Sequence, residues 1–513
     1  MSNLHSTYQL PAMSSTEIID YLSSPLFKGI GKKTAITLVE HFGTDILNIL
    51  DTSPHLLAEI PGLKTYRIDK INQAWSDSKN NPVRGAIALL LGIGTSFKLT
   101  LNICARYGIE TEKILKTNPY QLVEDLERVG FKTADKLARS LGITPDSPHR
   151  YFQAVLHTLS GALSEGHCFL PLDVLIERTE EILTLPEYQP DPQLLQTVIN
   201  EAIETNALLK GAYDGSIYLA KVYASELKVA NSIKQRLQQY DRPTQELSYW
   251  LSEYCNEVTT LSPEQRNALL MAEKHGISIL TGGPGRGKTY VLRTWVKWLQ
   301  HKGYKIALAA PTGKAANRMK DSTGVQAMTI HRLLKWQGAS HCFEHNQQNP
   351  LLHDWIIIDE FSMVDIFLFN SLLKALKTHC KILLVGDKDQ LPSIGAGMVL
   401  RDLLVSEVLP TTELTTIFRQ DSGSEIVEAS TSINYGQVPK IDTFTNPADW
   451  LNYSNCSLLE TNTPTATARA IASLVKEIAL TDVDLSHQLV VLAPQKKSPA
   501  GVHNRLQTSP TLI

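Results

Sequence analysis

The sequence predicts a multidomain α and α/β protein. The chain has 513 residues, which is too long for a single hydrophobic core. Its first third repeats a pattern of two apolar helices around a short glycine-containing turn. Its second half alternates buried strand patterns with helical ones, which is typical of a doubly wound parallel sheet.

Composition and charge exclude several classes of protein. Hydrophobic residues make up 43% of the chain and charged residues 20%, which excludes disordered and fibrous chains. No apolar run reaches the roughly 20 residues that span a bilayer, and the N-terminus lacks a signal-peptide pattern, so we expect a cytoplasmic protein without a membrane partner. The six cysteines lie far apart, which argues against a zinc site or a disulfide framework. The net charge of −3 does not indicate a nucleic-acid partner, so any such binding must come from local geometry.

After a leader over residues 1–20, four glycine-containing turns recur within 21–145, which indicates a stacked array. The clearest are "LFKGIGKKTAITLVEHFG" and "LLAEIPGLKTYRIDKI", and looser copies are "LLLGIGTSFKLTLNICARYG" and "LERVGFKTADKLARSLG". They resemble the helix-hairpin-helix motif, which binds the nucleic-acid backbone without reading its sequence. Glycine allows a phosphate to approach closely, and the next helix presents free N–H groups and the positive end of its dipole. The alternative is a set of turns that contact only protein.

The candidate DNA contacts in this array are Gly29, Gly31, Lys32 and Gly62. Further lysines that could add counterion release are Lys28, Lys33, Lys64 and Lys132. The segment 146–250 follows, where the pattern supports helices and a short β-hairpin. We interpret it as a helical, winged-helix-like connector.

The stretch "GGPGRGKT" fits a phosphate-binding loop. An apolar strand pattern precedes it and a helical pattern follows, which is the context that such a loop requires. Backbone N–H groups cradle the phosphates, Lys288 neutralises their oxygens, and the Thr289 hydroxyl holds Mg²⁺. The predicted nucleotide contacts are Gly282, Gly283, Pro284, Gly285, Arg286, Gly287, Lys288 and Thr289. We therefore expect ATP and Mg²⁺ as cofactors.

Two later strand patterns end in polar side chains. The run "DWIIIDEFSMVD" delivers Asp359 and Glu360 at the end of a buried strand. Asp359 is expected to hold the hydrated Mg²⁺, and Glu360 to polarise the attacking water. The run "KILLVGDKDQLPSIGAG" ends with Asp387 and Gln390, and Gln390 is placed to sense the γ-phosphate.

Seven motifs occur in the order found in the superfamily 1 helicases. Their amino-acid sequences resemble those of the RecD-like helicases of the RecD/TraA type. They are "LSPEQRNAL", "GGPGRGKT", "LAAPTGKAANRM", "TIHRLLKW", "IIIDEFSMVD", "LLVGDKDQLPSIGAG" and "LTTIFRQDSGSEI". The resemblance also covers the hairpin array and the connector. It implies a first RecA-like ATPase lobe over 251–404 and a partial second RecA-like lobe over 405–513. It further implies an ATP-dependent, nucleoid-associated DNA helicase that moves 5′ to 3′ on single-stranded DNA in repair or recombination.

The resemblance also assigns roles to individual residues. It implies that Gln265 contacts the adenine, that Gln390 couples nucleotide state to DNA, and that Arg419 reaches the γ-phosphate from the second lobe. The implied single-strand contacts of the first lobe are Pro311, Thr312, Gly313, Lys314, His331 and Arg332. Each of these could instead be a locally packed or solvated residue. Arg286 departs from the threonine usual in the family, and its side chain is expected to point outward.

The second lobe is expected to be incomplete, and the chain to be truncated at both ends. The family's Val-His-Lys-Ser-Gln-Gly-Ser and Tyr-Thr-Ala-Leu-Thr-Arg stretches do not occur in the sequence. One strand pattern, "QLVVLAP", remains, and its apolar surface would need a protein partner to cover it. We therefore expect the chain alone to bind ATP and DNA but to unwind little.

Three functions remain open at this point. The first is a helicase that acts on single strands and on junctions between single-stranded and double-stranded DNA. The second is an adaptor that binds ATP and DNA without unwinding. The third is a P-loop regulator unrelated to DNA, which the hairpin array argues against. The resemblance favours the first.

Overall fold

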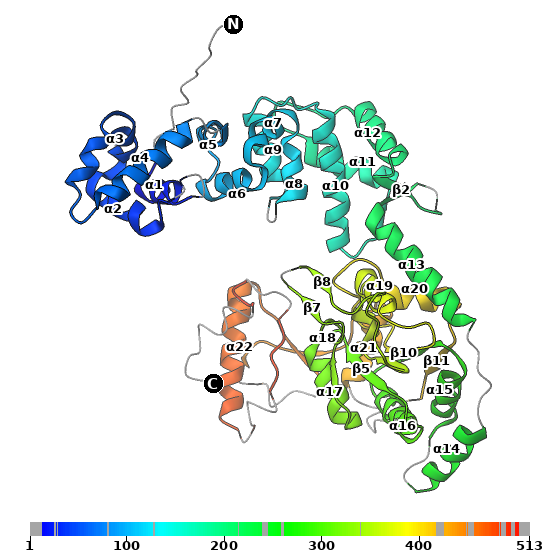
Figure 1. The fold of residues 1–513 in the computed structure, drawn as a ribbon. Coiled ribbons are helices and arrows are strands. Elements are labelled where there is room, and N and C mark those ends of the chain that lie inside the picture. The colour runs from blue at the N-terminus through cyan, green and yellow to red at the C-terminus, as the bar shows by residue number, and fades with distance from the viewer. Residues whose placement is uncertain are drawn as a thin grey trace. The chain divides into compact units, whose positions relative to one another are not determined.

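The computed structural model describes most of the chain (Figure 1). The described residues are 13–24, 27, 29–79, 82–126, 129–213, 215–238, 245–257, 261–338, 340–416, 425–447, 449, 456–481, 483, 489–493 and 498–501. They form two compact units. The first unit contains the chain up to Ser232 together with Asp365–Leu373 and Ser393–Met398, and the second contains the rest.

The first unit begins with two copies of one helical module. The first copy comprises α1 (Ser15–Leu22), α2 (Lys32–Phe42), η1 (Gly43–Asp45), α3 (Ile46–Thr52), η2 (Pro54–Glu59) and α4 (Thr65–Lys79). The second comprises α5 (Pro82–Gly92), α6 (Phe97–Tyr107), η3 (Gly108–Glu110), α7 (Thr111–Thr117), η4 (Pro119–Gln121), α8 (Leu122–Asp125) and α9 (Phe131–Ser140). The helical array predicted from the four turns is therefore present.

The two copies agree in backbone detail. Gly43 and Gly108, 65 residues apart, each end a helix with a positive φ, of 59° and 54°. Pro54 and Pro119, also 65 residues apart, each open a short 3-10 helix. Proline is favoured there because the first residues of a helix need no N–H donor. The four predicted turns are therefore two pairs within a duplicated module.

The connector consists of helices and one small sheet. Its elements are α10 (Pro148–Ser164), β1 (Phe169–Pro171), α11 (Leu172–Leu183), α12 (Pro192–Glu204), β2 (Leu208–Lys210), β3 (Ser216–Leu219) and α13 (Ala220–Leu237). β2 and β3 form an antiparallel hairpin, and β1 pairs with the other edge of β3. This agrees with the helices and hairpin of the expected winged-helix-like connector.

The second unit is built around a six-stranded parallel sheet of order β11-β4-β10-β9-β5-β6. The strands are β4 (Ile277–Gly282), β5 (Ile306–Ala310), β6 (Ala327–Thr329), β9 (Trp355–Ile358), β10 (Lys381–Gly386) and β11 (Thr411–Leu414). The helices are α14 (Gln245–Glu257), α15 (Pro263–Lys274), α16 (Lys288–His301), α17 (Gly313–Thr323), α18 (Ile330–Leu333) and α20 (Val399–Val405). Most of α19 (Ile366–Lys374) belongs to the first unit.

The central strands β4 and β9 are buried along their whole length because helices cover both faces of a parallel sheet. Trp295 and Trp298 of α16 lie in the core that packs on one face. Their large apolar surfaces fix α16, and with it the glycine loop that joins β4 to α16.

The sheet extends beyond residue 404, where we expected the first lobe to end. β11 pairs in parallel with β4, with Leu414 opposite Gly282. A strand that hydrogen-bonds to β4 belongs to the same sheet, so the first lobe reaches at least Leu414. The motif pattern did not reveal this because β11 is short and half polar.

The predicted strand "QLVVLAP" is wrong for the part that is described. Residues 489–493 have no regular structure, and Leu492 is 84% exposed. An apolar run forms a strand only where another strand offers hydrogen-bond partners. The described elements of this region are α21 (Glu425–Asn434), the parallel pair β12 (Asp442–Phe444) and β13 (Ser457–Leu459), and α22 (Pro464–Ala479).

Among the described residues, no helix combines the length and the hydropathy needed to cross a bilayer.

Candidate nucleotide site and nucleic-acid interface

The glycine loop between β4 and α16 has the backbone of an anion site. Gly285 and Gly287 have φ of 75° and 88°, values that a residue with a side chain rarely adopts. Gly282 cannot be replaced either, because an added Cβ would lie 2.8 Å from the Leu414 carbonyl oxygen. No side chain caps α16 at Gly287, so the first N–H groups of that helix are available to an anion.

Lys288 lies at the centre of this loop. Its Nζ donates to the carbonyl oxygens of Gly282 and Gly283, the latter at 3.1 Å. It also lies 3.8 Å from Asp387 Oδ2. Burial lowers the pKa of Lys288, although the nearby carboxylates oppose that shift. The ammonium is thus held by weak carbonyl partners that phosphate oxygens can replace.

The two carboxylates that follow β9 are unusually placed. Burial raises the pKa of Asp359, and burial followed by repulsion from Asp359 raises the pKa of Glu360. Glu360 has a φ of 52°, in a region that is strained for a residue with a side chain. Arg318 Nη1 lies 3.7 Å from Glu360 Oε1. Strained backbone and raised carboxyl pKa values are typical of functional sites.

The site has the groups that Mg²⁺ and a nucleotide require. Thr289 and Asp359 offer the oxygen ligands that Mg²⁺ prefers. Thr281 lies near the end of β4, and Ser362 lies two residues after Glu360. Both have buried hydroxyl oxygens without a hydrogen-bond partner in the described structure. Such orphaned groups are costly unless something completes them. The residues therefore fit a bound nucleotide and metal ion.

The structure locates three further predicted nucleotide residues, and a fourth lies outside the described residues. Arg286 does not point outward, because its Nη1 donates to the Leu414 carbonyl oxygen at 3.2 Å. Gln265 is 3% exposed, and its Oε1 accepts from the Ser262 N–H at the start of α15. Gln390 lies in an exposed loop after β10. Arg419 lies outside the described residues, as does Lys28 of the array.

The predicted single-strand contacts gather at one edge of the sheet. Pro311–Lys314 follow β5, and His331 and Arg332 follow β6, which is the parallel neighbour of β5. Thr312 caps α17 by accepting from the Ala315 N–H. Lys314 and Arg332 are exposed.

The predicted DNA contacts of the helical array lie at its turns. Gly29 and Gly62 have φ of 105° and 83°. Gly31 is the N-cap residue of α2, and Lys32 is exposed beside it.

Sequence reasoning missed an aromatic hairpin beside these residues. It consists of β7 (Trp336–Gln337) and β8 (Cys342–Phe343). The rings of Trp336 and Phe343 are 4.8 Å apart, and the His331 ring lies 5.7 Å from Phe343. Trp336 is 45% exposed. The signal that could have found it is an aromatic residue on each side of a Gly-containing turn, just after a basic helix.

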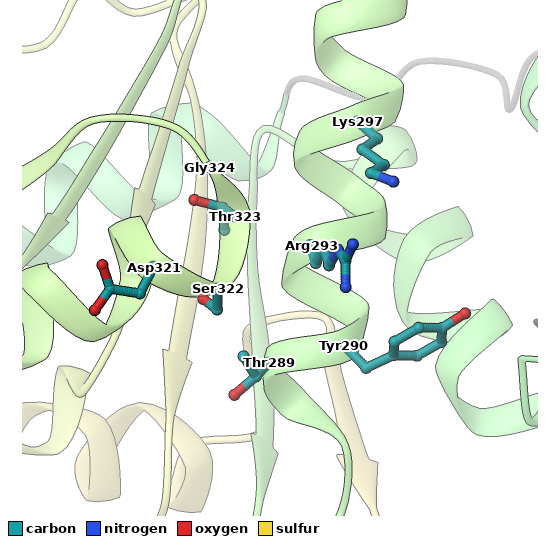
Figure 2. A pocket seen from close by; sticks show the side chains of 8 residues that line it. All are labelled: Thr289, Tyr290, Arg293, Lys297, Asp321, Ser322, Thr323 and Gly324. Carbon is teal, nitrogen blue, oxygen red and sulfur yellow. The ribbon is translucent and has the colours of Figure 1, made fainter. Parts of the chain in front are cut away.

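A second missed feature is an open pocket of about 560 Å³. It is lined by Thr289, Tyr290, Arg293, Lys297, Asp321, Ser322, Thr323 and Gly324. Arg293 and Lys297 project from successive turns of α16, and Ser322 and Thr323 lie at the end of α17 (Figure 2). Because Thr289 lines it, the pocket begins where the phosphate loop ends.

Together these features define the class of the protein. A glycine loop joins a buried parallel strand to a helix, and carboxylates follow two neighbouring strands of the same sheet. This is the arrangement of a P-loop NTPase with a RecA-like lobe.

Comparisons with known proteins narrow this class. Family models match residues 24–77 as a SAM-like helix-hairpin-helix tandem, residues 79–169 as the ATP-dependent RecD2 DNA helicase HHH domain, and residues 260–453 as an AAA domain. The chain is 30% identical to the ATP-dependent RecD2 DNA helicase of Deinococcus radiodurans, over 96% of this chain and 67% of that protein. It is 40% identical to the RecBCD enzyme subunit RecD of Mycolicibacterium smegmatis, over 28% of this chain and 30% of that subunit.

The chain belongs to the RecD-like family of ATP-dependent DNA helicases, within superfamily 1. Among solved structures it is also similar to the Pif1 helicase of Candida albicans. That likeness has 24% identity and a TM-score of 0.29 over 36% of this chain and 46% of that one, and it is too weak to add to the assignment.

Proposed function

We propose that the protein uses Mg²⁺ and ATP to move 5′ to 3′ along single-stranded DNA and to separate duplexes during repair or recombination. The observation that carries the proposal is the position of Lys288, which lies half-buried between the glycine loop and the carboxylates at the ends of β9 and β10. The family supports the direction of movement and the biological setting.

In this proposal the loop residues bind and orient the triphosphate. Lys288 exchanges its carbonyl partners for phosphate oxygens, and the first N–H groups of α16 face the same anion. A bound Mg²⁺, held by Thr289 and Asp359, would offset the charge that develops on the transferred phosphoryl group. Glu360 orients the attacking water and accepts its proton, a role that its raised pKa favours.

Two surfaces are proposed to hold DNA. The edge formed by Lys314, Arg332 and the aromatic hairpin combines cations with an exposed ring, which suits a single strand because bases stack on aromatic side chains. Trp336 is the ring that we expect to stack. The turns at Gly29 and Gly62 are proposed to contact phosphates without reading sequence. Junctions between single and double strands would use both surfaces.

Nucleotide binding is tested with Lys288→Ala. The variant is expected to lose binding of an ATP analogue, measured by calorimetry with Mg²⁺, because the loop loses its buried positive charge. The matched control is Lys320→Ala, which removes an exposed lysine of α17 outside the loop and the pocket and should bind as the wild type does. Equal affinity in the wild type and Lys288→Ala would refute the assignment of the loop.

Unwinding is tested on duplexes with one single-stranded tail. The chain alone is expected to unwind little, and any strand separation should occur only when the tail is on the 5′ side. Glu360→Gln should abolish that separation while it retains nucleotide binding. If the chain binds ATP and DNA but separates neither substrate, the helicase proposal fails and a binding adaptor remains.

A further inference from the structure

Arg286 is a cation of the phosphate loop whose side chain has no role in the family pattern, since threonine is usual at its position. The side chain folds back over the loop. An added Cβ on Gly283 would lie 3.2 Å from Arg286 Nε and 3.6 Å from Arg286 Cζ. The guanidinium therefore lies against the loop backbone, where Arg286 is half-buried.

The guanidinium is held on one side of β4. Its Nη1 donates to the Leu414 carbonyl oxygen at 3.2 Å, and Leu414 ends β11, which pairs with one edge of β4. Lys288 reaches the opposite side. Its Nζ lies 3.8 Å from Oδ2 of Asp387, which follows β10, and β10 pairs with the other edge of β4. The two cations of the loop therefore flank the end of β4.

The side of β10 carries the groups that act on the terminal phosphate. β9 lies beyond β10 in the sheet, and Asp359 and Glu360 follow β9. In the proposed function Asp359 holds Mg²⁺ and Glu360 orients water at the γ-phosphate. The γ-phosphate therefore faces the side on which Lys288 lies.

The side of β11 carries the groups expected at the other end of the nucleotide. Glu264, near the start of α15, accepts from the Thr415 N–H at 2.9 Å and from the Thr415 hydroxyl. These bonds attach the start of α15 to the residue that follows β11. Gln265, which the family resemblance implies contacts the adenine, is the next residue of α15. Arg286 therefore lies on the side where the α-phosphate joins the nucleoside.

The guanidinium has the donors and the charge that a phosphate requires. It has five N–H donors, and in the described structure the Leu414 carbonyl oxygen takes one of them. The carboxylate next to Leu414, that of Glu413, pairs with Lys388 at 2.9 Å. Burial is the main cause that lowers the pKa of Lys288, and the positive charge of Arg286 lowers it further. A polyphosphate between the two cations would replace their repulsion by attraction.

We propose that Arg286 is a specificity residue for the α-phosphate of the nucleotide. Its guanidinium holds an α-phosphate oxygen on the β11 side, while Lys288 holds the β- and γ-phosphates on the β10 side. ATP and ADP share the α-phosphate, so the contact strengthens the binding of both and does not favour the transition state. The proposal rests on the proposed function, because it requires that the loop bind a nucleotide.

The first test compares two nucleotides in the wild type and in Arg286→Thr. Calorimetry of the full chain with Mg²⁺ gives the affinities for ADP and for a non-hydrolysable ATP analogue. We expect Arg286→Thr to weaken both by a similar factor, about 10-fold, as loss of a hydrogen bond to a charged group does. A loss confined to the ATP analogue, or no loss for either ligand, would overturn the proposal. A wild type that binds neither ligand would instead overturn the proposed function.

The matched control is Arg266→Thr. Arg266 is an exposed arginine of α15, and like Arg286 it donates to a carbonyl oxygen, that of Ser248, at 3.3 Å. Its side chain lies outside the loop, so the control should keep both wild-type affinities. An equal loss of affinity in the control would show that the effect does not arise in the loop, and would overturn the proposal.

A second measurement separates contact with the α-phosphate from a role in holding the loop. ADP with sulfur in place of one α-oxygen exists as two diastereomers, and a guanidinium that contacts one oxygen binds them unequally because sulfur is a weak hydrogen-bond acceptor. By the same calorimetry we expect the wild type to prefer one diastereomer by about 5-fold and Arg286→Thr to lose most of that preference. An equal preference in both proteins would show that Arg286 only shapes the loop, and would overturn the proposal.

Discussion

The helices α4 and α9 close the two copies of the duplicated module, yet their surroundings differ. The fifth residue of each is an aspartate, Asp69 in α4 and Asp135 in α9. Asp69 is exposed. Asp135 is 5% exposed and accepts from Arg150 Nε at 2.7 Å and from the Tyr120 hydroxyl at 2.8 Å.

This difference indicates that the two copies of the module have different roles in the chain. The second copy packs against the connector. Arg150 of α10 is fully buried and also donates to the carbonyl oxygens of Pro145 and Leu183. The first copy leaves its second turn and the start of α4 exposed. We therefore expect the first copy to contact DNA and the second to hold the first in place.

The largest expected effect is on stability. Asp135→Ala leaves the buried Arg150 guanidinium without its anion, and breaking a buried pair in this way costs about 3–5 kcal/mol. Asp69→Ala removes the equivalent exposed side chain and should change stability by less than about 0.5 kcal/mol. Native-state hydrogen exchange measures both effects, on the α9 and α10 amides for Asp135→Ala and on the α4 amides for Asp69→Ala. Similar costs for the two variants would mean that the copies are packed alike.

The next effect is on DNA binding. Lys33 and Lys98 are each the second residue of the helix after a turn, in α2 and α6, and both are exposed. Lys33 follows the exposed Lys32, whereas Lys98 follows the buried Phe97. Lys33→Ala should reduce the slope of log affinity against log salt by about 1, as loss of one phosphate contact does.

Lys98→Ala is the matched control and should leave that slope unchanged. Titrations of the full chain with one oligonucleotide, at several salt concentrations, provide the comparison. A larger loss for Lys98→Ala would reverse the roles assigned to the two copies.

The smallest effect concerns pH. Asp125 accepts from Arg106 and Tyr107, and these bonds, with that to Arg106 the largest, lower the pKa of Asp125. A lowered carboxyl pKa contributes stability above the unfolded value of about 4, and this contribution is lost as the pH falls through the folded value. The residues equivalent to Arg106 and Tyr107 in the first copy are His41 and Phe42, whose rings pack together instead.

Acid should therefore weaken the second copy more than the first. The Arg106 side chain is 55% exposed and the Asp125 side chain 21%, so solvent screens the pair and the loss should not exceed about 1 kcal/mol. The measurement is the difference in unfolding temperature between the wild type and Asp125→Asn, which should narrow as the pH falls below about 4. A difference that stays constant with pH would show that Asp125 acts only through its shape.

Much of the nucleotide site could be predicted because its chemistry depends on local sequence. The spacing of Gly282, Lys288 and Thr289 specifies a strand, a turn and a helix start, and the structure has all three. The apolar run before Asp359 specifies a buried strand in the same way. Local propensity and the anion-binding end of a helix require no distant partner. A short stretch of sequence is therefore enough to predict the strand, the loop and the helix start.

Tertiary structure alone decided the features that depend on distant partners. The direction of the Arg286 side chain depends on the Leu414 carbonyl oxygen, 128 residues away. β11 exists as a strand, although most of its residues are polar, because β4 offers it a hydrogen-bonding edge. Residues 489–493 are all apolar but have no such edge among the described residues. Asp69 and Asp135 are the same residue at the same place in one motif, and their partners distinguish them, because Arg150 and Tyr120 donate to Asp135. Sequence fixes which groups a segment can offer, whereas burial and partners depend on what the rest of the chain packs against it.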